Sequence, residues 1–177
     1  MTRQQLEHIL RASAGITGAD RFIIIGSQAI LGQYPDPPRE LAESIEADIF
    51  TDRSPDDSNL IDGSIGEGSP FHTTFGYHAH GVAIETATLP AGWRDRLVPV
   101  TSPSIGGAIG LCLEVHDLAV SKLVAGREKD LNFLRALFRH ALADPHTVEQ
   151  RLAGTPLDAE AAARCTARLQ RLLKPTP

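Results

Sequence analysis

The stretch Phe22-Ile23-Ile24-Ile25-Gly26-Ser27 decides the fold of this chain, and the rest of the sequence is organised around it. Its four bulky apolar residues, three of them β-branched, predict a fully buried strand that stops at a glycine. Gly26 has no Cβ, so the backbone can turn sharply there or approach a ligand closely. Ser27 is a favourable N-cap for the helix that we expect to follow. Free N–H groups and a hydroxyl at such a helix start suit an anion, most naturally a phosphate.

Two carboxylates follow in the segment Glu46-Ala47-Asp48-Ile49-Phe50. Residues at i and i+2 of a strand share one face, so Glu46 and Asp48 should point the same way. Neighbouring carboxylates repel each other unless a cation lies between them, and oxygen ligands of this kind suit magnesium. We therefore interpret the pair as a site for Mg²⁺ or Mn²⁺. The alternative is an exposed edge strand with a solvated acidic face.

This order of a strand, Gly-Ser, a helix and a strand with two acids resembles the nucleotidyltransferase superfamily of the polymerase-beta type. That family's pattern is an apolar residue, Gly, Gly or Ser, a spacer, and then acid-apolar-acid-apolar. The sequence departs from it in having Glu46 where Asp is commoner and a longer spacer, 18 residues between Ser27 and Glu46. The resemblance implies that Gly26 and Ser27 hold the β- and γ-phosphates of an NTP. It also implies that Glu46 and Asp48 hold the metal ions.

The resemblance further implies a third carboxylate on a later strand, and Glu85 is the best-placed candidate. Residues 82–87, VAIETA, alternate in a way that predicts a strand with Val82 and Ile84 facing the core. Glu85 would face the other way, as a third metal ligand or as the base that takes the acceptor proton. The alternative is an ordinary solvent-facing glutamate.

A second cluster of charges lies at residues 122–130, KLVAGREKD. It is similar to the Lys…Arg-x-Lys/Arg-Asp element of a bacterial nucleotidyltransferase branch that includes AbiEii-type toxins of abortive-infection toxin–antitoxin systems. Three cations beside a helix break, Lys122, Arg127 and Lys129, can neutralise a triphosphate. Asp130 can orient Lys122 or Arg127, or act as a base. The alternative is a solvated helix end with i,i+3 and i,i+4 ion pairs.

The segment Tyr77-His78-Ala79-His80 puts two imidazoles on one face if it is extended. His78 and His80 could bind zinc if His72 or Glu85 supplied a third ligand. This opens an alternative function, a zinc hydrolase. More often such histidines line a pocket or form hydrogen bonds with backbone groups.

Composition places the chain among ordinary globular proteins, with 42% hydrophobic and 22% charged residues. The net charge of −5 argues against a general nucleic-acid coat protein. Cys112 and Cys165 form no CxxC motif, so we expect buried, reduced thiols. No apolar run approaches the ~18–20 residues of a membrane span, and no signal peptide is visible. We therefore expect a cytoplasmic protein with no membrane partner.

Strand patterns precede helical ones along the chain, which predicts an α/β or α+β fold. We expect a small mixed sheet that carries the site and a C-terminal helical bundle. Residues 1–114 should form a nucleotidyltransferase-like sheet domain, and residues 115–177 a helical region packed on it as one structural unit.

The resemblance implies magnesium-dependent transfer of a nucleotidyl group from an NTP such as ATP to an acceptor hydroxyl. The acceptor could belong to RNA, especially a tRNA end, to a protein or to a small molecule. The branch implies a toxin–antitoxin component with a cognate toxin or antitoxin protein as partner. The rival hypothesis is a catalytically degenerate binding module or antitoxin.

Overall fold

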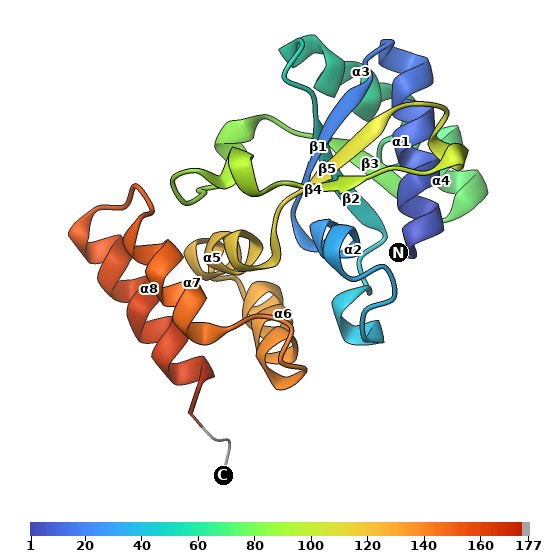
Figure 1. The fold of residues 1–177 in the computed structure, drawn as a ribbon. Helices are drawn as coiled ribbons and strands as arrows, with labels where there is room; N and C mark the ends of the chain where they lie inside the picture. Colours follow the sequence, from blue (N-terminus) through green and yellow to red (C-terminus); the bar gives the residue numbers. More distant parts are fainter. Residues whose placement is uncertain (175–177) are drawn as a thin grey trace.

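The computed structural model describes residues 1–174, so residues 175–177 of the expected helical region lie outside the described residues. Figure 1 shows a twisted five-stranded sheet in the first part of the chain and a group of helices in the last part. The predicted fold class is confirmed: a mixed sheet carries both parallel and antiparallel neighbours, and the helices α5 to α8 follow it in sequence.

The sheet has the strand order β3-β2-β1-β5-β4. β1 pairs antiparallel with β2 and parallel with β5, β3 runs parallel to β2, and β4 runs antiparallel to β5. The central position of β1 explains its apolar composition, because residues 22–25 are all buried. The strands are β1 (Arg21–Ile25), β2 (Glu46–Phe50), β3 (His78–Gly81), β4 (Val98–Val100) and β5 (Ile109–Cys112).

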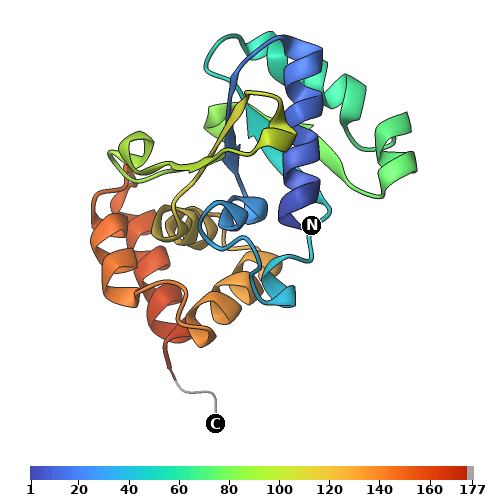
Figure 2. The ribbon, with the colours of Figure 1, turned by 45° about the vertical axis from the view of Figure 1, so that its right-hand side comes forward.

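The helices include the predicted ones at the N-terminus, after Ser54 and throughout the last third of the chain. They are α1 (Arg3–Thr17), α2 (Ile30–Gln33), α3 (Pro55–Ile65), α4 (Pro70–Phe75), α5 (Val115–Ala125), α6 (Glu128–Arg139), α7 (Pro145–Ala153) and α8 (Ala159–Leu172). Figures 1 and 2 both place α5 to α8 at the opposite end of the sheet from α3 and α4.

One face of the sheet is covered by α1 and α3. Leu6, Ile9 and Leu10 of α1 are fully buried in the same cluster as Ile24 of β1 and Ile49 of β2. Each such side chain stabilises the fold by about 1.5–3 kcal/mol relative to an exposed one. On the opposite face, Ile23 and Ile25 of β1 are buried with Phe50 of β2 in a second, smaller cluster, and β2 presents Glu46 and Asp48 before Phe50.

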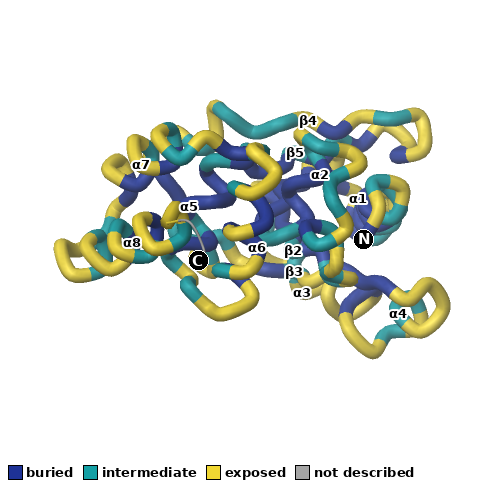
Figure 3. The backbone as a smooth tube through the Cα atoms, turned by 90° about the horizontal axis from the view of Figure 1, so that it is seen from below, coloured by how far each residue is buried: buried dark blue, intermediate teal, exposed yellow. Residues whose placement is uncertain are grey.

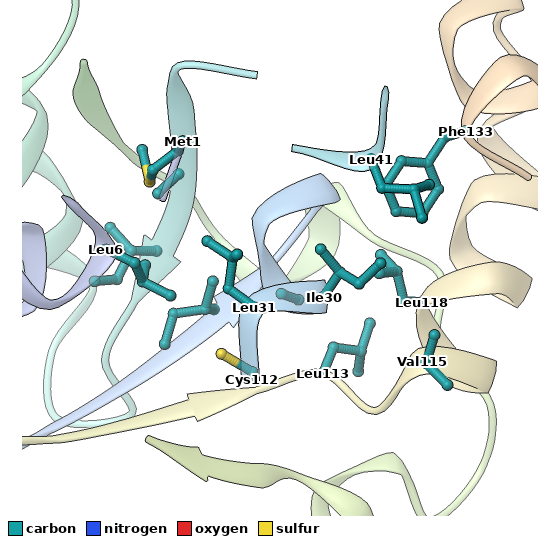
Figure 4. Packing of buried hydrophobic residues seen from close by; sticks show 14 of the residues in the cluster. Met1, Leu6, Ile30, Leu31, Leu41, Cys112, Leu113, Val115, Leu118 and Phe133 are labelled. Atoms are coloured by element: carbon teal, nitrogen blue, oxygen red, sulfur yellow. The ribbon is translucent and has the colours of Figure 1, made fainter. Parts of the chain in front are cut away.

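The short helix α2 connects the packing of the sheet with that of the helical region. In Figure 4, Leu31 lies toward Leu6 of α1, whereas Ile30 lies toward Leu118 of α5. Figure 3 shows buried backbone running through the centre of the molecule, where β2, α2 and α5 meet. One hydrophobic cluster consequently contains buried side chains from both the sheet and the helical region.

The strand predicted over residues 82–87 is wrong. The strand beside β2 is β3, which ends at Gly81, and residues 84–86 form a 3-10 turn. The ladder ends because the Ser58 hydroxyl donates to the Val82 carbonyl at 2.8 Å and the Thr86 hydroxyl donates to the Ala83 carbonyl at 2.7 Å. These bonds satisfy carbonyls that a neighbouring strand would otherwise need to satisfy.

The prediction of free, buried cysteines is confirmed for both Cys112 and Cys165. Burial raises the pKa of the Cys112 thiol to about 12, so this thiol stays protonated and unreactive at neutral pH. No helix within residues 1–174 is both long enough and apolar enough to cross a membrane.

Candidate functional site

The turn after β1 passes directly over the carboxylate of Asp48. Gly26 has φ +67° and ψ −169°, a conformation that favours glycine. A Cβ at this position would lie 2.0 Å from Asp48 Oδ2, which no side chain could tolerate without a shift of the carboxylate. The glycine is therefore required for two reasons, its backbone angles and the close approach of the acid strand.

The N-cap prediction for Ser27 is wrong. Residues 27–29 form a 3-10 turn that continues into α2, and Gly26 occupies the cap position. The Ser27 hydroxyl instead accepts a hydrogen bond of 2.9 Å from Lys122 Nζ, which lies 95 residues further along the chain. The Gly-Ser turn is thereby connected to the cationic element of the helical region.

The two acids of β2 share one face, as predicted, because Ala47 and Ile49 are buried on the opposite face. The side chains of Glu46 and Asp48 are 40% and 27% exposed, so both remain open to a ligand. Burial and then repulsion from Glu46 raise the pKa of Asp48, while a hydrogen bond from His80 opposes the rise. A cation bound between the two carboxylates would relieve this repulsion.

The parallel register of β3 on β2 places His78 opposite Glu46 and His80 opposite Asp48. His80 Nδ1 lies 3.1 Å from Asp48 Oδ1 and 3.9 Å from Glu46 Oε1. Ligand atoms of Glu46, Asp48 and His80 all lie within 4.8 Å of one another, the one such group in the part of the chain that the structure describes. The predicted common face of the two histidines is confirmed, and one of them joins the acid pair.

The other two histidines do not complete a three-histidine zinc site. His78 is only 4% exposed, and its Nε2 lies 3.4 Å from Glu46 Oε2 without forming a hydrogen bond. His72 stacks against the His78 ring with 4.5 Å between centroids. Neither His72 nor His78 belongs to the group that Glu46, Asp48 and His80 form.

The cationic element is folded around Asp130. Helix α5 ends at Gly126, where φ is +61°, and the chain then reverses into α6. This break brings Lys122 and Asp130 together, with 2.9 Å between Nζ and Oδ1. Asp130 Oδ2 accepts a hydrogen bond of 2.7 Å from Arg127 Nε.

The environment of Asp130 fixes its charge. Its carboxylate is fully buried, and burial alone would favour the neutral form. The hydrogen bonds from Arg127 and Lys122 outweigh burial and lower the pKa of Asp130. Asp130 is therefore anionic at neutral pH and holds both cations in place.

The Gly-Ser turn, the acid pair and the cationic element line one cleft of about 210 Å³. Arg127 lines it with a side chain that is 61% exposed, and Lys129 is also among the lining residues. The cleft contains all but one of the residues that the sequence predicts for a nucleotidyltransferase site, together with His80 of the zinc alternative. The predicted residues that line it are Gly26, Ser27, Glu46, Asp48, Lys122, Arg127, Lys129 and Asp130.

Glu85 is the exception, and the expected convergence of three carboxylates is wrong. It lies in the 3-10 turn that replaces the predicted strand, is exposed, and lines a separate hollow with Phe50 and Asp52. Its neighbours Thr86 and Ala87 line the cleft instead.

A larger cleft adjoins the first and was not predicted. Its volume is about 630 Å³, and it shares Ser27, Ser44 and Lys129 with the smaller cleft. Its walls come from the loop before β2, which contributes Glu40, and from α6, which contributes Arg139. No sequence pattern links these two segments.

One of the comparisons with known proteins found a related family. A family described as "Nucleotidyltransferase of unknown function (DUF6036)" matches residues 4–157, which include every residue of both clefts. No curated protein and no solved structure matches the chain. The match supports the superfamily expected from the sequence and gives no support to the branch of AbiEii-type toxins. The chain thus belongs to this family of nucleotidyltransferases, whose function is unknown.

Proposed function

We propose that the chain transfers a nucleotidyl group from an NTP to an acceptor hydroxyl in a reaction that depends on a divalent metal. The observation that supports this most directly is the 2.9 Å contact between Lys122 and Ser27. It joins the Gly-Ser turn to the Lys–Asp element in the cleft that also contains the acid pair. Three motifs separated in sequence therefore face one small volume.

The donor atoms of the cleft fit a divalent cation. Glu46 and Asp48 offer carboxylate oxygens, the ligands that Mg²⁺ and Mn²⁺ take in proteins, within 4.8 Å of each other. When bound, such a cation supplies positive charge that stabilises the attacking and leaving oxygens. The residues of the chain then have to bind and orient the nucleotide and the acceptor.

Lys122 and Arg127 would neutralise the phosphates, and Asp130 would position both of them. In the transfer, the acceptor oxygen would bond to the α-phosphorus, the bond to pyrophosphate would break, and the acceptor proton would pass to water. Asp130 is fully buried and bonded to both cations, so orientation suits it better than proton transfer. The turn at Gly26 and Ser27 would hold the β- and γ-phosphates.

The two clefts together offer enough room for both substrates. A volume of about 210 Å³ falls below the ~300–1,000 Å³ of typical ligand pockets, so it suits the phosphates alone. The adjoining cleft of about 630 Å³ would accommodate the nucleoside or the acceptor. Lys129 lies at the junction of the two clefts, where it can contact either part.

The acceptor classes that we propose are RNA, especially a tRNA end, a protein side chain and a small molecule. A role in a toxin–antitoxin pair, with a cognate protein partner, rests on the likeness of residues 122–130 to the element of AbiEii-type toxins. These finer proposals depend on the acceptor found by experiment.

A second candidate function is a nucleotide-binding module that has lost catalysis. The position of Glu85 favours it, because Glu85 lies outside the cleft and the third carboxylate that lines the cleft, Asp130, is bound to Lys122 and Arg127. This protein would bind an NTP through Lys122 and Arg127 without transferring it.

The test uses each of the four NTPs labelled at the α-phosphate, with Mg²⁺ or Mn²⁺ and an extract of cells as the source of acceptors. We expect label in an acceptor with the native chain and none with Asp48→Asn. Asp56→Asn, which changes an exposed aspartate outside the clefts, is the matched control. Nucleotide binding without transfer would support the binding module. Release of labelled monophosphate alone would support a hydrolase of the kind suggested by His78 and His80.

A further inference from the structure

The third polar group beside the acid pair is an imidazole. His80 comes from β3, and its parallel register on β2 fixes it opposite Asp48. Its Nδ1 is 3.1 Å from Asp48 and 3.9 Å from Glu46. Half of the side chain is exposed, so packing does not force the ring into this position.

A second, independent feature points to the same place. His78 is 96% buried, and neither of its ring nitrogens has a hydrogen-bond partner. An unpaired buried polar group costs free energy, so a native structure usually satisfies it. The Nε2 of His78 is directed at Glu46, 3.4 Å from Oε2. A small rotation of the Glu46 carboxylate would complete this bond and fix the carboxylate in one orientation.

We propose that Glu46, Asp48 and His80 form a mixed carboxylate–imidazole site that prefers a divalent transition-metal ion, such as Mn²⁺ or Co²⁺, to Mg²⁺. His78 is the outer partner that orients Glu46. This inference rests on the proposed function for the presence of a metal, but it concerns which metal is bound. It replaces the expectation of an all-carboxylate site completed by Glu85.

The preference follows from ligand chemistry. Mg²⁺ requires near-ideal octahedral oxygen ligands and retains several waters, so a nitrogen donor adds little to its affinity for the site. Transition-metal ions gain more from imidazole, and for nitrogen and oxygen sites the affinity rises from Mn²⁺ to Co²⁺. His80 should therefore contribute much more to the affinity for Co²⁺ or Mn²⁺ than to the affinity for Mg²⁺.

The outer partner matters because a ligating carboxylate is held by its own hydrogen bonds. Loss of such a partner typically lowers metal affinity by about 10- to 100-fold. We expect this loss for His78→Phe, which keeps an aromatic ring against His72 but removes both nitrogens. Loss of the ligand itself, in His80→Ala, should reduce the affinity at least as much.

The test measures metal binding directly, without transfer. Mn²⁺ binding is followed by electron paramagnetic resonance, Co²⁺ binding by its visible absorption, and Mg²⁺ binding by calorimetry. Each titration is made without nucleotide and again with a non-hydrolysable NTP analogue. We expect His80→Ala to lose affinity for Mn²⁺ and Co²⁺ but much less for Mg²⁺, and to shift the Co²⁺ spectrum. His80→Asp should favour Mg²⁺ relative to the native chain.

The control variant is His146→Gln, which changes an exposed histidine of α7 outside both clefts and should leave every affinity unchanged. The proposal would be overturned if His80→Ala changed the Mn²⁺ and Mg²⁺ affinities equally, or changed neither. It would also be overturned if the native chain bound no metal, either alone or with the NTP analogue. If the native chain shows the preference but transfers nothing, the proposed function fails and the metal site stands. If the native chain transfers nucleotide with Mg²⁺ and shows no preference between the metals, the proposed metal preference fails and the proposed function stands.

Discussion

Asp130 and Lys122 form a buried ion pair, but the structure predicts that losing the acid costs more than losing the lysine. The side chains are 0% and 8% exposed, and Nζ and Oδ1 lie 2.9 Å apart. In Asp130→Asn the Lys122 ammonium loses its only carboxylate partner among the described residues and keeps the Ser27 hydroxyl and the Phe133 ring, 5.4 Å away. Removing one partner of a buried pair costs about 3–5 kcal/mol.

In Lys122→Met the Asp130 carboxylate keeps other hydrogen-bond donors. Asp130 keeps the Arg127 guanidinium, with Nε at 2.7 Å and Nη2 at 3.3 Å, and the Arg127 backbone N–H at 3.3 Å. Methionine also fills most of the volume of the lysine stem, so no cavity opens. The substitution removes the charge-assisted hydrogen bond to Asp130, which costs about 1.5–3 kcal/mol. It also removes the bond to the Ser27 hydroxyl, which lines the cleft and can bond to water instead.

The assay is thermal and urea unfolding at pH 7, followed by circular dichroism. For a chain of this length each kcal/mol shifts Tm by roughly 2–4 °C, so Asp130→Asn should lower Tm by about 6–20 °C and Lys122→Met by about 3–12 °C. Lys129→Met, at an exposed cation of the same segment, should change stability by no more than about 0.5 kcal/mol. A larger loss for Lys122→Met than for Asp130→Asn would refute the view that Asp130 organises both cations.

Four further predictions concern single positions. Gly26→Ala should lower stability by about 1–3 kcal/mol, measured by urea unfolding, and weaken Mn²⁺ binding, because φ is +67° and the new Cβ would displace the Asp48 carboxylate. Glu85→Gln should leave metal affinity and transfer unchanged, since Glu85 lies outside the cleft; a loss of either would restore its predicted role. Arg139→Ala should raise KM for the substrate in the larger cleft with little change in kcat, and an unchanged KM would contradict this use of the cleft. Hydrogen bonds from Arg53 lower the pKa of Asp57, so its contribution to stability is complete above the unfolded value near 3.9 and is lost as pH falls; Tm of Asp57→Asn should depend less on pH between about 5 and 3 than Tm of the native chain.

The strands that could be predicted are those whose own residues specify them. β1 is an apolar run in the centre of the sheet, and β2 alternates between buried and polar residues. β3, in contrast, reads His-Ala-His-Gly and contains no β-branched residue, so its propensity gave little indication of a strand. Residues 82–87 carried the stronger local pattern, but a hydrogen bond from Ser58 of α3 ends the ladder before them. That contact is tertiary, and no local pattern contains it.

The same distinction applies to the site. The chemistry of Asp48 and Lys122 could be inferred from spacing, because both belong to short motifs with recognisable order. The histidine pair could also be recognised, since His78 and His80 are two residues apart. That His80 joins the acids of β2 could not be predicted, because it depends on the pairing of β3 with β2. Glu85 was misplaced for the same reason, because the direction of its side chain was predicted from a strand that does not form.

The cleft depends on the order of strands as much as on the identity of its side chains. β1 lies between β2 and β5, so the Gly26 turn at its end has the acids of one neighbour on one side. On the other side, the parallel strand β5 runs in the same direction and leads into α5, whose last turn carries Lys122 back to Ser27. An antiparallel β5 would deliver α5 to the opposite end of the sheet and leave the turn without a cation. The helical region therefore completes the site rather than merely following it, because the cations beside the Gly-Ser turn, Lys122 and Arg127, come from α5 and the N-cap of α6.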